Sequence, residues 1–457
     1  MKRIFLAIAL LSCVNAFCGD IVISKDTTIN DVWTIPATTI YRFETGGHIS
    51  GTGRIQGGIL DAAMTQNIFD TTITVNPSGL RNGWFSAAWF GASPSRADNS
   101  GYLQKAINTC ISSWWLIIPK GKYDFSKMLE VSSIYNGLYV GVTIHISGDG
   151  ITNFWTPELG TILNYKGSGI AIGLQLNKGT VINNLVIQGG WVSPTGSKMD
   201  YNNLTDSNYT DQSGNNYGPS LRGICIDFNS NQNGSVSGST GIYIYDVIIR
   251  NFYYGIIGSL NGTTLNNEIL HLNRVQFGDG KYGFVSTQGQ EKGNVLENIY
   301  SWGAIYCLFS SGNMLNGQGG DYTIYNLNVA GACVMPFNIN QRGWGRITIS
   351  NGFFEQIAKI GIIKGSTSIS INNVTFDLAY QSEVGVKTVL ETDNYNTVFN
   401  NCTIRYFGNT TDTIHLSGNM TFNYSTFGSP IVNTAGMNTV NFPMSLPIRS
   451  NIKLDVK

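Results

Sequence analysis

Three charged residues recur at matching places in the second half of the chain. Glu355, Asp377 and Arg405 each follow a recurring polar residue by four positions. If every repeat forms one coil of a stack, equal offsets place the three side chains on neighbouring coils about 4.8 Å apart. Two carboxylates about 5 Å apart are typical of retaining glycoside hydrolases, and their proximity should raise one pKa so that this group acts as a general acid. We therefore predict these three residues as catalytic.

Two other interpretations of the same residues remain open. The carboxylates of Glu355 and Asp377 could bind Ca²⁺, because Ca²⁺ prefers hard oxygen ligands, and such a site would fit an eliminating lyase. The three residues could instead form a solvated charge ladder in which Arg405 offsets the repulsion between the acids. No other cofactor and no metal-ligating residue is predicted, because the four histidines lack the spacing of a metal site.

Aromatic residues in and near a long interruption of the repeat are predicted to bind sugar. Residues 189–222 are rich in Gly, Asn and Tyr, and loops on a rigid scaffold commonly carry recognition. Aromatic rings offer a flat apolar face against which a sugar ring can stack. The predicted substrate-binding residues are Trp191, Tyr201, Tyr209 and Tyr217 in this segment, and Trp302 in the repeat. The alternative is an adaptable loop without a binding role.

A second group of polar residues falls on one long repeat. These residues could line a groove, although single residues of this kind are usually surface charges. The group consists of Glu268, His271, Arg274, Asp279, Glu291 and Glu297.

The elements that must position these candidates follow from the repeat. One polar residue heads each repeat, and from residue 246 onward successive examples are 22 to 28 residues apart. Apolar residues then alternate with other residues, which is the period-two pattern of a strand with one face inward. Such repeats indicate a β-solenoid, whose coils bury their apolar edges by stacking. The recurring residues are Asn184, Asp246, Arg274, Asn298, Asn326, Asn351, Asn373, Asn401 and Tyr424.

We interpret the recurring polar residue as structural rather than as a binding residue. Asn tolerates the left-handed backbone that a tight corner requires, and its side chain can hydrogen-bond along a stack of coils. The strands that follow should point their first apolar residue into the stack. The residues predicted to lie inside are Leu185, Val247, Val275, Leu327, Val374 and Cys402.

The composition implies a nearly neutral surface. Of the 457 residues, 12% are charged and the net charge is zero, whereas about 25% charged residues is usual for soluble domains. Nucleic acid is disfavoured as the main partner, because phosphate binding requires clustered Lys and Arg. The composition favours a polysaccharide.

Three short motifs resemble a known superfamily. They are Trp89-Phe90-Gly91-Ala92, Leu103-Gln104-Lys105-Ala106-Ile107 and Ile118-Pro119-Lys120-Gly121-Lys122-Tyr123. Together with residues 35–92, they resemble the opening of the pectate-lyase-like, right-handed parallel β-helix superfamily. That superfamily includes polysaccharide-degrading enzymes and tailspike-like proteins of Bacteroidetes and their phages.

The resemblance implies an all-β fold, namely a right-handed parallel β-helix with a short N-terminal β region and a capping helix. It also implies a secreted or virion-associated protein that binds and cleaves a cell-surface or plant polysaccharide, as a glycoside hydrolase or a lyase. The alternative is a non-catalytic glycan-binding or structural phage tail component. Homotrimers or other virion proteins are the implied partners. The paired Asp-Asp, His-Gly and Arg-x-Lys motifs of polygalacturonases are absent from the chain, which argues against that activity.

The chain divides into five predicted parts. The first has the basic and apolar pattern of a signal peptide, with lipid anchoring at Cys13 or a retained apolar segment as alternatives. The cysteines outside this leader lack metal or redox spacing and are predicted to be buried free thiols. The parts are a leader at 1–16, a small β region at 17–85, a capping helix and strand at 86–130, the β-helix at 131–440 with an insertion at 189–222, and a tail at 441–457.

Overall fold

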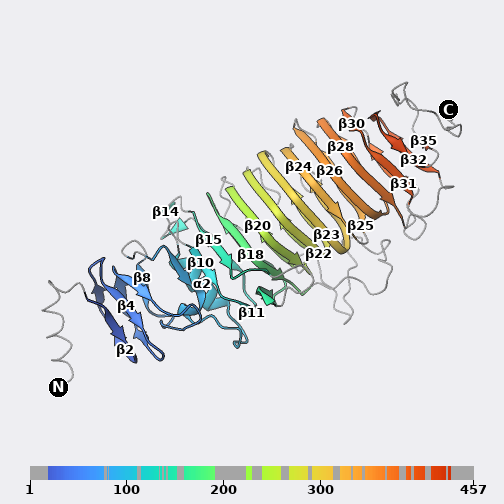
Figure 1. Cartoon of the computed structure of the whole chain (residues 1–457). Helices are drawn as coiled ribbons and strands as arrows, with labels where there is room; N and C mark the ends of the chain where they lie inside the picture. Colours follow the sequence, from blue (N-terminus) through green and yellow to red (C-terminus); the bar gives the residue numbers. More distant parts are fainter. Residues whose placement is uncertain are drawn as a thin grey trace, which may run out of the picture.

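The computed structural model shows an elongated stack of parallel β-strands (Figure 1). No helix among the described residues is long and apolar enough to cross a membrane. The structure describes residues 19–76, 80, 82–110, 115–132, 134–135, 138–139, 143–151, 159–175, 177–190, 223–228, 239–258, 267–286, 291–311, 320–330, 333–341, 345–365, 368–379, 388–392, 396–406, 413–428 and 431–433.

The N-terminal part is a small, narrow stack of its own. Its strands pair in parallel as β1-β4-β7, β2-β5 and β3-β6-β8, so each round of chain adds one strand to each side. Ile49 and Ile55 are fully buried between these sides. Glycine is required at the corners: a Cβ on Gly57, whose φ is +92°, would lie 2.0 Å from the carbonyl oxygen of Ile35. The strands are β1 (Ile21–Ile23), β2 (Asp26–Ile29), β3 (Val32–Thr34), β4 (Ile40–Phe43), β5 (His48–Gly51), β6 (Arg54–Gln56), β7 (Ile59–Asp61) and β8 (Thr74–Asn76).

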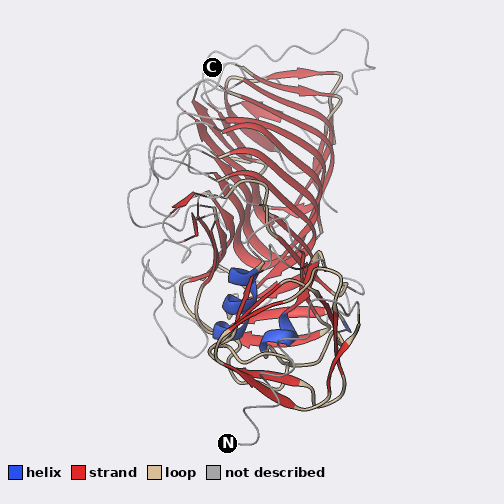
Figure 2. Ribbon diagram, turned by 90° about the vertical axis from the view of Figure 1, so that its left-hand side faces the viewer, coloured by secondary structure: helices blue, strands red, loops and turns tan. Residues whose placement is uncertain are grey.

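A helix lies at the junction of the small stack and the long one (Figure 2). Helix α2 (Ser100–Thr109) follows the short 3₁₀ turn η2 (Ala87–Phe90). Its residues Leu103, Ala106 and Ile107 keep the predicted spacing and are buried. The carboxylate of Asp98 accepts hydrogen bonds from the Ser100 amide at 2.9 Å and from the Ser126 hydroxyl at 2.6 Å. Asp98 therefore joins the start of the helix to the strand region that follows it.

Three parallel sheets form the sides of the long stack within the described residues. The first sheet contains β9 (Trp84–Ser86), β10 (Trp115–Ile118), β15 (His145–Gly148), the opening halves of β18 (Val181–Gln188), β20 (Thr240–Arg250), β22 (Glu268–Ser286), β23 (Glu291–Ser311), β24 (Gly320–Val329), β26 (Arg346–Ile357) and β28 (Ser368–Leu378), and then β30 (Thr397–Asn400) and β33 (Thr421–Asn423).

The second sheet begins where these long strands turn a corner. It contains β11 (Gly121–Phe125), β16 (Thr161–Tyr165), the continuing parts of β18, β20, β22, β23, β24, β26 and β28, and then β31 (Thr403–Tyr406) and β34 (Thr426–Phe427).

The third sheet closes each coil, and a small hairpin of β13 (Ile134–Tyr135) and β14 (Leu138–Tyr139) lies apart from it. The sheet contains β12 (Leu129–Ser132), β17 (Ile170–Gln175), β19 (Ile224–Asp227), β21 (Tyr254–Ile257), the ends of β22 and β23, β25 (Cys333–Gln341), β27 (Gly361–Gly365), β29 (Leu390–Thr392), β32 (Ile414–Gly418) and β35 (Ile431–Asn433).

The recurring polar residues form the corner between the first and second sheets. All nine of them have a left-handed backbone, with φ between +50° and +57°. Their side chains connect successive coils: Asn326 donates to the side-chain oxygen of Asn298 at 2.8 Å, and Asn401 donates to that of Asn373 at 2.8 Å. The structural role predicted for this residue is confirmed.

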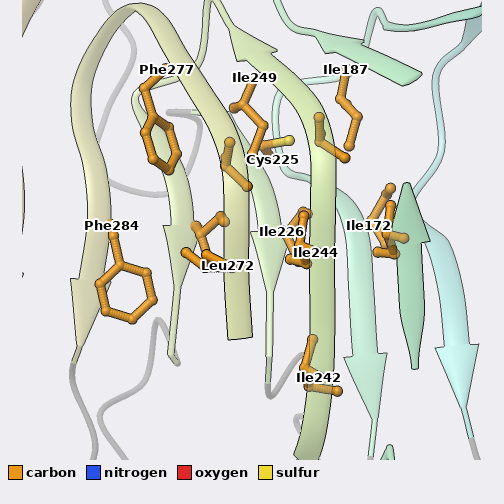
Figure 3. Packing of buried hydrophobic residues seen from close by; sticks show 14 of the residues in the cluster. Ile172, Ile187, Cys225, Ile226, Ile242, Ile244, Ile249, Leu272, Phe277 and Phe284 are labelled. Carbon is orange, nitrogen blue, oxygen red and sulfur yellow. The ribbon is translucent and has the colours of Figure 1, made fainter. Parts of the chain in front are cut away.

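The interior is a continuous apolar column. The six residues predicted to lie inside are each at most 1% exposed. Phenylalanines extend the column by stacking from coil to coil, as Phe354 and Phe376 do with ring centroids 5.1 Å apart. Figure 3 shows Ile244, Leu272 and Phe277 among the side chains packed between neighbouring strands. The parallel β-helix fold is therefore confirmed.

Candidate functional site

Asp377 and Arg405 lie on neighbouring strands of the second sheet, in direct register. The guanidinium donates twice to the carboxylate, from Nε to Oδ1 at 2.6 Å and from Nη2 to Oδ2 at 3.0 Å. The side chain of Asp377 is only 3% exposed, whereas that of Arg405 is 52% exposed. These hydrogen bonds and the charge of Asp377 raise the pKa of Arg405. The pair is a buried carboxylate covered by a guanidinium that still faces solvent.

Glu355 lies one strand before this pair, at a break in the ladder. Phe354 pairs with Phe376 and Ile357 pairs with Leu378, so two residues, Glu355 and Gln356, stand opposite the single residue Asp377. This is a β-bulge, and Gln356 has a left-handed φ of +56°. Bulges of this kind re-aim side chains.

The side chain of Glu355 is partly exposed, and among the described residues it has no ion-pair partner. Asp377 differs from it, because both of its carboxylate oxygens are engaged by Arg405. The equal offsets therefore bring Glu355, Asp377 and Arg405 to consecutive strands, but they do not produce two equivalent free carboxylates. Of the two carboxylates, Glu355 is the one that is open to a ligand.

Aromatic side chains flank Glu355 on the same outer face. Phe354 is buried, so Phe353 and Glu355 both point outward by strand alternation, and Phe353 is 41% exposed. Tyr300 occupies the matching position two strands earlier, through the register Tyr300–Asn328–Phe353. Sequence reasoning did not select Tyr300 or Phe353. The sequence did contain a signal for them. Tyr300 lies two residues before Trp302 and Phe353 lies two residues before Glu355, and residues two apart in a strand share a face.

Trp302 lies on this face as well, next to Tyr300 along its strand. Its indole covers the backbone of Gly278 on the preceding strand: a Cβ at Gly278 would fall 2.4 Å from two atoms of the ring. Glycine at 278 thus makes room for the ring. Two strand spacings, about 9.6 Å, separate the strands of Trp302 and Glu355, and Ala330 stands between them at the equivalent position.

The other predicted sugar-binding residues, Trp191, Tyr201, Tyr209 and Tyr217, lie outside the described residues. Within the described part, no group of three or more His, Cys, Asp and Glu side chains could hold a metal ion. The five described cysteines are buried free thiols, as predicted, and burial raises the pKa of each.

The second polar group is divided between separate contacts. His271 lies 3.3 Å from Glu297, measured from Nε2 to Oε2, on the first sheet. Arg274 instead forms two hydrogen bonds of 2.6 Å to Asp246 at the corner. These contacts do not bring the group together around one point.

No protein-family model and no curated protein sequence matches the chain. Several solved structures are similar to it. One is the catalytic unit of a GH87 alpha-1,3-glucanase from Streptomyces thermodiastaticus, at 13% identity and a TM-score of 0.38, over 78% of this chain and 66% of that one. Another is an exopolygalacturonase from Thermotoga maritima, at 10% identity and a TM-score of 0.39, over 81% and 91%. A third is the A-module of a mannuronan C-5 epimerase from Azotobacter vinelandii, at 13% identity and a TM-score of 0.40, over 82% and 100%.

Proposed function

We propose that the chain binds a polysaccharide along the outer face of the second sheet and cleaves it there. One observation carries the proposal: Glu355, a carboxylate without an ion-pair partner among the described residues, shares an outer face with the aromatic side chains of Trp302 and Phe353. Aromatic rings present large apolar surfaces on which sugar rings can stack. The rigid stack holds these groups in place before a ligand arrives, which lowers the entropy lost on binding.

The roles follow from the surroundings of each group. Glu355 can exchange a proton with a bound sugar, because it is accessible and its oxygens are not engaged by a described cation. Arg405 presents its guanidinium to solvent while Asp377 fixes its orientation. It can therefore donate hydrogen bonds to sugar oxygens or to a sugar carboxylate. Both hydrolysis and elimination require such a proton transfer.

A Glu355→Gln variant tests this proposal. We expect it to lose at least 100-fold in cleavage rate, which is the usual range for removing a general acid or base, while polysaccharide binding changes less than twofold. Cleavage is measured as new reducing ends, and elimination as absorbance of unsaturated products, on bacterial surface and plant polysaccharides. Glu44→Gln, at an exposed position in the small stack, is the matched control. Full activity in Glu355→Gln would exclude Glu355 as the proton-transferring group.

A non-catalytic glycan-binding protein is the second candidate, and the Asp377–Arg405 pair favours it. An acid whose two oxygens are both held by a guanidinium is not free to act as the nucleophile of a retaining hydrolase. In this case the wild-type protein binds polysaccharide but releases no reducing ends or unsaturated products. Trp302→Ala should then weaken binding without any change in product formation.

Export to the cell exterior or to a virion, and assembly as a homotrimer or with other virion proteins, are further parts of the proposal. They rest on the leader and on the resemblance described from the sequence, and residues 1–18 lie outside the described part. Fractionation of expressing cells tests the first, and light scattering of the purified protein tests the second.

A further inference from the structure

The first sheet carries a row of aromatic side chains on its outer face. The members occupy the same register position on successive strands, with Val181 between His145 and Tyr243, and they span five strand spacings, or about 24 Å. We call this row the aromatic stripe. It consists of Trp84, Trp115, His145, Tyr243 and His271.

The stripe is open to solvent at Trp115 and Tyr243, whereas Val181 between them is buried and Trp84 packs against the buried Trp89. Trp115 is 44% exposed and Tyr243 is 38% exposed. Neighbouring rings contact each other along the row: the centroids of Trp115 and His145 are 4.9 Å apart, and those of Tyr243 and His271 are 6.1 Å apart. Exposed aromatic side chains that gather in this way on one face of a protein mark a candidate binding surface.

A row of small and polar side chains runs beside the stripe, two residues further along the same strands. It includes Ser147, Asn183, Tyr245 and Asn273. Asn183 is 3% exposed, and its side-chain oxygen has no hydrogen-bond partner among the described residues. Because Ser147 and Asn183 are buried, Tyr245 and Asn273 are the members of this row that a ligand on the outer face can reach.

Apart from histidine, neither row carries an acidic or basic residue over these six strands; the carboxylate of Glu297, on the next strand, contacts His271 at one end of the stripe. Burial lowers the pKa of His145, which keeps that ring neutral at physiological pH. A face without cations does not suit nucleic acid or an anionic membrane, because both require Lys and Arg. The near absence of charge on this face favours an uncharged ligand, and its aromatic and polar side chains favour one that offers apolar ring faces and hydroxyl groups.

We propose that the aromatic stripe is a second polysaccharide site, which binds an uncharged glycan chain lying along the axis of the stack. The chain's sugar rings stack on the exposed aromatic side chains, and its hydroxyls hydrogen-bond with Tyr245 and Asn273 of the polar row. This inference goes beyond the proposed function, because it concerns another sheet, on the far side of the corner from Glu355, and requires no cleavage.

Affinity electrophoresis tests the stripe. Native gels contain hydroxyethyl cellulose, laminarin or galactomannan as uncharged polymers, or polygalacturonate as a charged one. All variants carry Glu355→Gln, so cleavage cannot affect migration. We expect Trp115→Ala with Tyr243→Ala to weaken binding to at least one uncharged polymer by tenfold or more. Tyr243→Phe, which keeps the ring, should bind within twofold of its parent.

The control is Tyr424→Asn, which removes an exposed aromatic side chain at the far end of the stack. It should bind as the parent does. Unchanged binding of every uncharged polymer in the double variant overturns the proposal, and so does an absence of binding to any of them in the parent. Loss of binding in the double variant towards anionic vesicles only would also overturn it, in favour of a membrane. Trp302→Ala reports on the Glu355 face, so failure of that site is recognised separately.

Discussion

At the scale of single residues, the main finding is that Glu355 and Asp377 have different surroundings, although they occupy equivalent positions in the sequence repeat. Asp377 is almost fully buried and held by Arg405, whereas Glu355 is partly exposed. Offsets along the chain predicted their neighbouring strands. They could not predict the bulge at Glu355 and Gln356, because a bulge adds a residue within a strand without a change in composition. Nor could they predict which acid Arg405 engages, since that depends on side-chain geometry.

Removing the arginine should expose the energetic role of the pair. Arg405→Ala removes both donors to the Asp377 carboxylate, and because the guanidinium is half exposed, water can replace part of what is lost, so the change costs about 1.5 kcal/mol. We expect the free energy of unfolding in urea to fall by about that amount. Asp377→Asn with Arg405→Ala should recover part of the loss, because no carboxylate is left without its cation. A fall below about 0.5 kcal/mol in Arg405→Ala, the level expected for the exposed control Arg54→Ala, would contradict this role.

At the scale of elements, the corner between the first and second sheets depends on one backbone conformation. The period-two pattern and the recurring Asn predicted its position at every repeat, because a residue that interrupts alternation in a stack must turn the chain. Tyr424 adopts the same left-handed conformation, with φ of +52°, and is 69% exposed. A bulky residue is unfavourable there, whereas Asn tolerates it.

Tyr424→Asn should therefore stabilise the protein by about 1 kcal/mol, and the new amide can also extend the ladder from Asn401. The reverse change, Asn401→Ala, should destabilise it by a similar amount, since it removes the bond to Asn373 as well. Thermal unfolding of the two variants beside the wild type measures both. Destabilisation by Tyr424→Asn would show that the tyrosine ring contributes more than its backbone strain costs.

The stability that Asp98 provides at the start of helix α2 should be lost in acid. Hydrogen bonds from Ser100, and then from Ser126, lower the pKa of Asp98 to about 2, against about 3.9 in an unfolded chain. The stabilisation is therefore complete above about pH 4 and is lost as the pH falls towards 2. Asp98→Asn should lower the unfolding temperature at pH 6 and flatten its decline between pH 4 and 2. Asp31→Asn, at an exposed position in the small stack, is the control, and an unchanged slope in Asp98→Asn would refute the assignment.

At the scale of the whole molecule, the sequence predicts the interior of the solenoid better than it predicts the residues on its outer faces. Periodicity was sufficient to predict the stack, its interior and its corners, because every coil buries apolar residues at equivalent positions. The aromatic residues outside escaped prediction, since Trp115 and Tyr243 belong to repeats whose alignment becomes visible only once the strands are in register. The members of the stripe come from different strands, so their spacing along the chain is irregular and does not reveal the row.

The last prediction follows from the two proposed sites together. The Glu355 face and the aromatic stripe lie on sheets that meet at a sharp corner, so one extended glycan chain should not occupy both. A molecule with two independent sites joins two polymer chains, and the gain in avidity depends on both sites being intact. We expect Glu355→Gln protein to raise the viscosity of a solution of its polysaccharide. Trp302→Ala, or Trp115→Ala with Tyr243→Ala, in the same background should still bind single chains yet lose this cross-linking. Cross-linking that survives both sets of changes would mean that the bivalence arises elsewhere, for example from an oligomer.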